Sequence, residues 1–86
     1  MSYRLAYTKR ALKDIQSLSI DTKQRLKLAL DKYCENPLFY AKKLVNSDIG
    51  NYRFRVGEYR IIFDIIENNQ LLILRVGHRK DIYRSV

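Results

Sequence analysis

The 86-residue sequence contains only one cysteine, one proline and three glycines. A single cysteine excludes an intrachain disulfide and a metal cluster held by several thiolates, so we expect a protein of the reducing cytoplasm. No cofactor is expected. The low proline and glycine content argues against a disordered or low-complexity chain. No apolar run has the length of a signal peptide or the roughly 20 residues of a membrane span, so no membrane partner is expected.

Acidic residues are also few. The chain has 9 Asp and Glu against 17 Lys and Arg, which leaves a net charge of +8 at pH 7. This charge favours binding to polyanions, and nucleic acid, an acidic protein or a membrane surface are all compatible with it. It is equally compatible with a basic surface that only keeps the protein soluble. A chain of this length closes one modest core, so residues 1–86 are expected to form a single domain.

The N-terminal half predicts one strand and two amphipathic helices. Alternation indicates a half-buried strand at Tyr3, Leu5 and Tyr7. Thr8 is expected to cap the first helix. The apolar face of that helix consists of Ala11, Leu12, Ile15 and Leu18. A second helix is predicted from a capping box of Asp21 and Gln24. Its apolar stripe consists of Leu26, Ala29, Leu30 and Tyr33, and it ends at Asn36–Pro37.

The segment Leu38–Gly50 shows no clear periodicity and carries Lys42 and Lys43 between apolar residues. We interpret it as a long connection that crosses the surface. Cys34 lies beside the second apolar stripe, and no neighbouring group would activate its thiol. It is therefore interpreted as a small buried hydrophobic residue.

From Tyr52 onward the sequence is rich in Tyr, Ile, Val and Phe, and it is interrupted by Gly57–Glu58 and Asn68–Asn69. Such dipeptides form tight hairpin turns, so three antiparallel strands are predicted. The whole order predicts an α+β fold: a twisted antiparallel β-sheet of about four strands with the two N-terminal helices packed on one face. The first strand is expected to join the sheet.

A Gly57–Glu58 turn determines which residues of the first hairpin share a face, because directly opposed residues do so. One face is apolar and consists of Tyr52, Phe54, Val56, Tyr59, Ile61, Phe63 and Ile65. The other face carries Arg53, Arg55 and Arg60. Like charges directly across two strands destabilise the pair by up to about 1 kcal/mol, and an anionic ligand would relieve the repulsion of Arg55 and Arg60.

An Asn68–Asn69 turn extends both faces onto the last strand. The core face is expected to gain Leu72, Leu74 and Val76, and the arginine-bearing face Arg75 and Arg79. That second face also carries Ile62, Ile66, Leu71 and Ile73. Part of it must therefore be covered by the chain or must contact a nucleotide base. Gly77, opposite Arg60, leaves the backbone open to a ligand or marks a bend. The alternative for any single arginine is an ion pair with Glu58, Asp64 or Asp81, but these three acids are too few to neutralise the whole arginine cluster.

Two runs, YRFRVGEYRIIF at Tyr52–Phe63 and RVGHRKDIYR at Arg75–Arg84, resemble the RelE/ParE toxin superfamily and especially its RelE branch. Weaker similarity at Ala11–Lys13 and Asn36–Leu44 extends the resemblance over nearly the whole chain. It implies a RelE-like fold and a toxin of a type II toxin–antitoxin system. It further implies a metal-independent, ribosome-dependent endoribonuclease, whose partners are a cognate antitoxin protein, the ribosome and mRNA.

The resemblance also assigns residues. Catalytic roles fall on Arg53, Arg55, Arg60, Arg79 and Tyr83. Guanidinium groups would stabilise the phosphorane formed when a 2′-hydroxyl attacks its own phosphate. Tyr83 would stack on a base, or alternatively anchor the C-terminus in the core. RNA binding is expected of Arg75, Lys80, Arg84, Lys42 and Lys43.

The general base is not identified, because the best-studied members of the branch have lysines where this chain has Arg53 and Arg55. A guanidinium does not readily lose its proton near neutrality. His78 is the alternative acid or base, although strand alternation turns it toward the core face, where it would be structural. Glu58, in the turn, is a weaker candidate.

Two other functions remain compatible with the sequence. The ParE branch poisons DNA gyrase without cleaving RNA, and a shared fold does not separate the two activities. The stretch Val76–Arg79 with Tyr83 resembles the RelE branch, since the gyrase poisons generally lack that tyrosine and the sheet arginines. The other alternative is a nucleic-acid-binding module that does not cleave. In each case an acidic or amphipathic antitoxin segment is expected to cover the basic face and displace the C-terminal residues.

Overall fold

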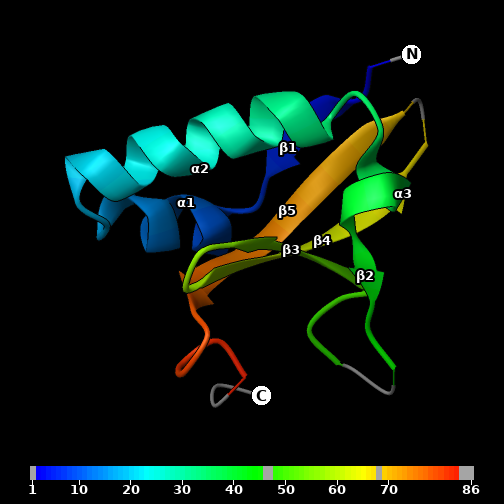
Figure 1. The fold of residues 1–86 in the computed structure, drawn as a ribbon. Helices are drawn as coiled ribbons and strands as arrows, with labels where there is room; N and C mark the ends of the chain where they lie inside the picture. The colour runs from blue at the N-terminus through cyan, green and yellow to red at the C-terminus, as the bar shows by residue number, and fades with distance from the viewer. Residues whose placement is uncertain (1, 46–47, 68, 84–86) are drawn as a thin grey trace.

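The computed structural model describes residues 2–45, 48–67 and 69–83 (Figure 1). Strand β1 (Arg4–Tyr7) leads into helices α1 (Lys9–Gln16) and α2 (Ile20–Tyr33). A one-turn helix, α3 (Pro37–Tyr40), and a short strand, β2 (Lys42–Lys43), follow. Three longer strands, β3 (Tyr52–Val56), β4 (Tyr59–Ile66) and β5 (Gln70–His78), complete the fold. No helix in these ranges is long and apolar enough to cross a membrane.

The strands form one sheet in the order β1-β5-β4-β3-β2. All neighbours are antiparallel except β1 and β5, which are parallel, so the sheet is mixed and not wholly antiparallel as predicted. The predicted α+β class is confirmed, as is the place of the first strand in the sheet. The sheet has five strands rather than about four, because β2 forms inside the segment that was predicted to be an irregular connection, which also contains α3.

The helix caps agree with the sequence prediction at α1 and differ from it at α2. Thr8 caps α1, and its side-chain oxygen accepts a hydrogen bond from the Ala11 N–H at 3.0 Å. Helix α2 is capped by Ser19, whose hydroxyl accepts from the Thr22 N–H at 3.2 Å, so the capping box predicted at Asp21 is wrong. Asp21 lies in the first turn, where a carboxylate interacts favourably with the helix dipole.

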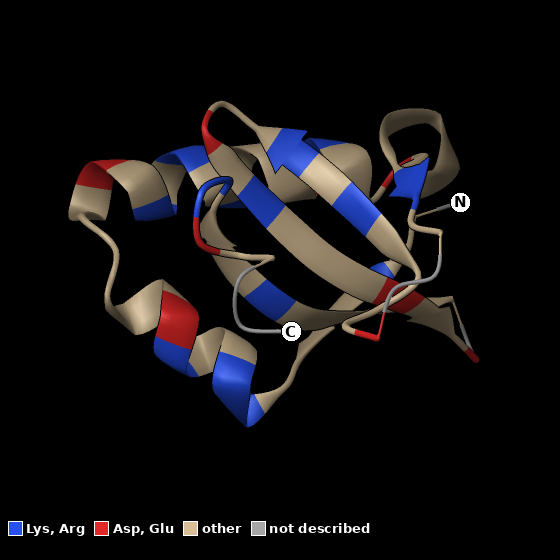
Figure 2. Cartoon of the chain, turned by 90° about the horizontal axis from the view of Figure 1, so that it is seen from below, with Lys and Arg blue, Asp and Glu red and all other residues tan. Residues whose placement is uncertain are grey.

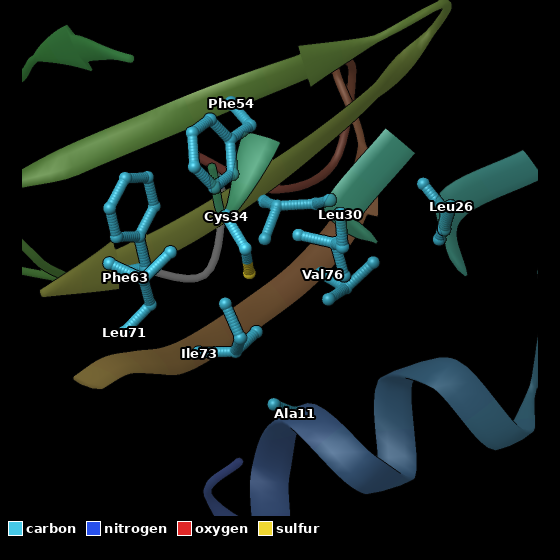
Figure 3. Close-up of a cluster of buried hydrophobic side chains, with 10 residues drawn as sticks. Ala11, Leu26, Leu30, Cys34, Phe54, Phe63, Leu71, Ile73 and Val76 are labelled. Carbon is cyan, nitrogen blue, oxygen red and sulfur yellow. The ribbon is translucent and has the colours of Figure 1, made fainter. Parts of the chain in front are cut away.

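The hydrophobic core lies between the two long helices and one face of the sheet (Figure 3). Its buried side chains are Ala11, Leu26, Leu30, Cys34, Phe54, Ile61, Phe63, Leu71, Ile73 and Val76. The rings of Phe54 and Phe63 stack with their centroids 4.2 Å apart. Burial raises the pKa of the Cys34 thiol, so this residue is a buried hydrophobic side chain as predicted, and not a nucleophile.

The first hairpin, β3–β4, has the predicted register. Arg55 lies opposite Arg60 and Val56 lies opposite Tyr59. Its apolar face packs into the core as expected, with Phe54, Ile61 and Phe63 fully buried and Tyr52, Val56, Tyr59 and Ile65 partly buried.

The second hairpin, β4–β5, departs from the prediction near its turn. Ile66 pairs with Gln70, so three residues rather than two connect the strands. Asn69 has a φ of 56°, the left-handed conformation that commonly ends a three-residue hairpin loop. Asn68, the other residue of the predicted turn, lies outside the described residues.

A bulge in β5 restores the predicted register further along this hairpin. Phe63 pairs with Ile73 and Ile62 with Arg75, so Leu74 is an extra residue between the two pairs. On the turn side of this bulge the side chains of β5 lie on the face opposite to the prediction, whereas Phe63 and Ile65 of β4 keep their predicted face. Leu71 and Ile73 are therefore buried in the core, and the core positions predicted for Leu72 and Leu74 are wrong.

Candidate active site

Strands β3 and β4 present three arginines on the sheet face that points away from the core. Figure 2 views this side, where blue Lys and Arg segments lie next to each other on neighbouring strands. Arg55 pairs with Arg60, and Arg53 pairs with Ile62, so the three arginines alternate with core residues. We call the surface formed by Arg53, Arg55 and Arg60 the arginine face. Lys42 of β2 pairs with Arg53 and extends this face to the edge of the sheet.

Arg60 is the buried member of the arginine face, with an exposed fraction of 6%. Its Nη1 donates hydrogen bonds to the carbonyl oxygens of Gly57 at 3.1 Å and Tyr59 at 3.0 Å. Burial lowers the pKa of Arg60, and the positive charges of Arg55 and Arg53 lower it further. A guanidinium nevertheless stays protonated near neutrality. Among the described residues no carboxylate forms an ion pair with Arg60, so it is a buried positive charge held only by carbonyl groups.

The β3–β4 turn brings two further arginines to this region. Gly57 has a φ of 58°, and a Cβ atom at this position would lie 2.7 Å from Nη2 of Arg25, which comes from α2. On the next residue, the Glu58 carboxylate accepts a hydrogen bond from Nε of Arg79. The Arg79 backbone N–H also donates to the Glu58 carbonyl oxygen at 2.7 Å. The turn therefore joins β3 and β4 to α2 and to the segment after β5.

The segment after β5 turns back over the sheet, and it crosses in front of the strands in Figure 2. The N–H groups of Asp81 and Ile82 both donate to the His78 carbonyl oxygen at 2.9 Å. Ile82 is buried and packs on Gly77, where an added Cβ would lie 3.1 Å from Cδ1 of Ile82. The space that the sequence left open for a ligand at Gly77 is therefore filled by Ile82.

This packing brings two of the predicted site residues to Arg60. The positive charge of Arg79 contributes to lowering the pKa of Arg60, whereas Tyr83 acts in the opposite direction. Both side chains thus lie within electrostatic range of the buried guanidinium. Tyr83 is 44% exposed, so the residue that anchors this segment is Ile82. The tyrosine ring is left accessible to a nucleotide base.

The apolar part of this side of the sheet is covered by the chain itself. Ile62 is fully buried although it faces away from the core. A Cβ on Gly50 would lie 2.6 Å from Cγ2 of Ile62 and 2.8 Å from Cδ1 of Leu74, so the loop before β3 packs directly on both residues. The Asn51 N–H donates to Oδ1 of Asp64 at 2.8 Å and fixes this loop. Asp64 is therefore a loop anchor, and it forms no ion pair with an arginine in the part of the chain that the structure describes.

Arg75 pairs with Ile62 and so lies on the predicted side of the sheet, but its side chain is bound by α1 and does not join the arginine face. Its Nε donates to Oδ2 of Asp14 at 2.8 Å, and its Nη2 donates to Oδ1 at 3.3 Å. Asp14 also accepts a hydrogen bond from the Val76 N–H at 3.0 Å. Both side chains of the ion pair are only 18% exposed. Arg75, which the sequence grouped with the RNA-binding residues, therefore ties β5 to α1.

His78 is not brought to the arginine face either. It pairs with Tyr59 on the core side, and the two rings meet edge to face with centroids 5.7 Å apart. Its Nδ1 accepts a hydrogen bond from the Lys80 N–H at 3.1 Å. This position agrees with the alternation of the strand and removes the predicted acid or base from the neighbourhood of Arg60.

The remaining basic residues predicted to bind RNA are dispersed. Lys80 is exposed in the turn after β5. Lys43 pairs with Tyr52 and so lies on the opposite face from Lys42. Arg84 lies outside the described residues. The structure therefore brings together the predicted catalytic set without His78, and of the predicted binding set it places Lys42 next to these residues.

Sequence reasoning missed three side chains that shape this site. Arg25 and Asp14 belong to the polar sides of amphipathic helices, where the pattern predicts solvent exposure and no particular partner. Ile82 did carry a signal, because it is an apolar residue inside the charged run HRKDIYR. No group of three or more His, Cys, Asp or Glu residues within the described ranges is arranged to hold a metal ion.

Comparisons with known proteins agree with this architecture. A family model described as "ParE toxin of type II toxin-antitoxin system, parDE" matches residues 5–83. Toxin RelG of Mycobacterium tuberculosis is 33% identical over 86 residues, which cover 98% of this chain and 99% of that protein. The mRNA interferase toxin RelE of Escherichia coli is 29% identical over 82 residues, which cover 93% of this chain and 86% of RelE.

A solved structure shows the same fold. The toxin–antitoxin complex RelBE2 from Mycobacterium tuberculosis contains a chain that matches with a TM-score of 0.81 and 27% identity. The match covers 92% of this chain and 100% of the other. The family model and the relatives extend over nearly the whole sequence, including both arginine-rich strands and the segment after β5. The chain therefore belongs to the RelE/ParE superfamily of type II toxin–antitoxin toxins, in its RelE-like branch.

Proposed function

We propose that this toxin cleaves mRNA on the ribosome, without a metal, by attack of a ribose 2′-hydroxyl on the adjacent phosphate. The observation that carries the proposal is the buried Arg60 with Arg55, Arg53 and Arg79 around it and Tyr83 in range. Among the described residues only Arg79 of these four arginines forms an ion pair with a carboxylate, and a scissile phosphate would supply a further anion. The activity named for the Escherichia coli relative supports the same reaction.

The arginine cluster suits the transition state better than the ground state. Attack by the 2′-hydroxyl forms a phosphorane that carries more negative charge than the starting diester, so cations fixed in advance stabilise it selectively. Arg60 is fixed by its two carbonyl partners and by burial. Arg79 lies on the segment that crosses the face and would bind a second phosphate oxygen. The accessible ring of Tyr83 would stack on a neighbouring base and hold the sugar in line for attack.

Proton transfer remains the part of the reaction for which the cluster supplies no ordinary base. His78 faces Tyr59 on the other side of the sheet, and arginines such as Arg53 and Arg55 are poor bases. We propose that the cluster activates the hydroxyl by stabilising its alkoxide. The proton then leaves to a group supplied by the ribosome or by solvent. As the 2′-oxygen bonds to phosphorus, the bond from phosphorus to the 5′-oxygen of the next nucleotide breaks, and that oxygen takes up a proton from solvent.

The decisive experiment uses purified toxin and ribosomes programmed with a defined message. The wild-type protein is expected to cut the message at the decoding site. Arg60→Ala and Arg79→Ala are expected to abolish cutting, because each removes a cation that meets the phosphorane. Arg4→Ala makes the same change in net charge on the exposed edge strand β1 and should cut normally. Normal cutting by Arg79→Ala would overturn the assignment of the site.

A second candidate, inhibition of DNA gyrase, is favoured by one observation, since the matching family model is named for the ParE toxins. A gyrase supercoiling assay separates the two functions. We expect no inhibition at toxin concentrations that cut message on ribosomes. Inhibition of supercoiling without RNA cleavage would establish the second candidate, and RNA binding with neither activity would establish a module that only binds nucleic acid.

We further propose that a cognate antitoxin binds and silences this toxin, and the similarity to a chain of the toxin–antitoxin complex RelBE2 from Mycobacterium tuberculosis supports such a partner. The net charge of +8 and the arginine face suit an acidic or amphipathic segment. An open apolar groove of about 410 Å³ between α1, α2 and β1 offers a second docking surface, and Lys23 and Lys27 lie among its lining residues. Addition of the antitoxin should stop cleavage, and a mixture that still cuts would contradict this assignment.

A further inference from the structure

Arg79 is attached to the β3–β4 turn at two points, and both belong to Glu58. Its backbone N–H donates to the Glu58 carbonyl oxygen at 2.7 Å, and its Nε donates to Oε2 of the Glu58 carboxylate. The first bond fixes the main chain of the segment after β5. The second fixes the guanidinium, whose side chain is otherwise 51% exposed.

The charges around Arg79 explain why the guanidinium needs this second bond. The buried Arg60 lies within electrostatic range of Arg79, and the two positive charges repel each other. A half-exposed arginine has many rotamers that would carry its charge away into solvent. Within the described ranges Glu58 is the carboxylate that forms an ion pair with this segment, and it opposes that escape.

The bond to Glu58 uses only one edge of the guanidinium. An arginine side chain has five N–H donors, and Nε supplies one of them. Among the described residues the two terminal nitrogens of Arg79 have no hydrogen-bond partner. Four donors therefore remain for an anion next to Arg60.

We infer that Glu58 is a positioning residue for the proposed cleavage: it holds Arg79 by Nε so that both terminal nitrogens meet the scissile phosphate. This inference rests on the proposed function. Glu58 does not act as the general base here, because its carboxylate already accepts a hydrogen bond from Arg79, and this bond lowers its pKa. A weak base in an ion pair is suited to orient an arginine and poorly suited to take a proton.

The inference predicts opposite effects on chemistry and on binding. Glu58→Gln and Glu58→Ala remove a negative charge from a basic surface, so they should bind RNA as tightly as the wild type or up to about threefold more tightly. The same variants lose the preorganised Arg79, so cleavage at saturating toxin should fall about tenfold, equivalent to about 1.4 kcal/mol. Loss of structure alone would weaken both measurements together.

The experiment measures single-turnover cleavage on programmed ribosomes and binding of a message whose attacking 2′-hydroxyl is replaced by hydrogen. Glu67→Gln is the matched control, because Glu67 is exposed after β4 and its substitution makes the same charge change. The control should behave like the wild type.

The outcomes separate this inference from the function on which it rests. If the wild type cuts and Glu58→Gln cuts equally fast, the positioning role is overturned while the nuclease assignment stands. If Glu58→Gln loses binding and cleavage in parallel, the role is overturned as well. If the wild type does not cut RNA, the proposed function fails first, and the positioning role fails with it.

Discussion

Arg55 and Arg60 lie directly opposite each other on β3 and β4, at a cross-strand position where like charges repel. Folding alone gains nothing from this pair. Arg55→Gln should therefore raise the free energy of unfolding by up to about 1 kcal/mol, measured by urea denaturation, while it slows cleavage on ribosomes. Arg10→Gln, an exposed change on α1, should leave both unchanged. A destabilised Arg55→Gln protein would show that the arginine pair is stabilised within the fold and does not need an anion.

Ile82 and Gly77 form the contact that places Arg79 and Tyr83 over the sheet. Ile82→Ala should lower cleavage as strongly as Arg79→Ala, because the segment after β5 loses its anchor. Gly77→Val should have the same effect by occupying the space that Ile82 fills. The circular dichroism of the sheet should persist in both variants, because Ile82 lies outside the main core cluster.

Ile20→Ala is the control for the anchor, since Ile20 is also an isoleucine but 71% exposed on α2. It should cut message at the wild-type rate. Normal cleavage by both Ile82→Ala and Gly77→Val would mean that Arg79 reaches its position without this contact, and the packing account of the site would be wrong.

The first hairpin and the arginine face could be predicted from the sequence, because two local features determine them. The Gly57–Glu58 turn sets the register, and strict alternation from Tyr52 to Phe63 then assigns each side chain to a face. The second hairpin could not be predicted in the same way. The run Leu71–Leu74 is apolar at every position, so either register buries two large side chains, and the pattern cannot reveal the bulge at Leu74.

The partners of the acidic residues could not be predicted either. The sequence offered Glu58, Asp64 and Asp81 to the arginines, but only Glu58 forms such a pair among the described residues. Asp64 binds a backbone N–H of the loop that covers Ile62. Asp14, on the polar side of a helix, binds Arg75 instead. These choices depend on how helices and loops pack on the sheet, which local patterns do not encode.

The Asp14–Arg75 pair gives a prediction about stability that is separate from cleavage. Asp14 accepts hydrogen bonds from the Arg75 side chain and from the Val76 N–H, and its side chain is largely buried. Asp14→Asn should therefore lower the free energy of unfolding by about 1–3 kcal/mol, because buried donors lose a charged acceptor.

The matched control for this prediction is Asp31→Asn. Asp31 forms an exposed ion pair with Lys27 at 3.8 Å, and such surface pairs contribute little. Its unfolding curve should overlap with that of the wild type. Under conditions where both variants are folded, each should cut message normally, because neither residue touches the arginine face. A cleavage defect in folded Asp14→Asn would show that Arg75 takes part in the reaction after all.

The ion pair between Glu58 and Arg79 can be observed without RNA, by the titration of one carboxyl group. The hydrogen bond from Arg79 lowers the pKa of Glu58 below the ordinary value of a glutamate. The positive charge of Arg79 lowers it further, and His78 and Arg60 act in the same direction. A carboxylate with a lowered pKa in the folded state stabilises that state above its unfolded pKa, and the contribution disappears as the pH falls through the folded pKa. Acidification below the ordinary glutamate range should therefore release Arg79.

NMR titration of the Glu58 side chain should show a midpoint that rises in Arg79→Gln and stays unchanged in Arg4→Gln. An identical midpoint in wild type and Arg79→Gln would mean that the two side chains do not pair in solution, and Glu58 would then have no means of positioning Arg79.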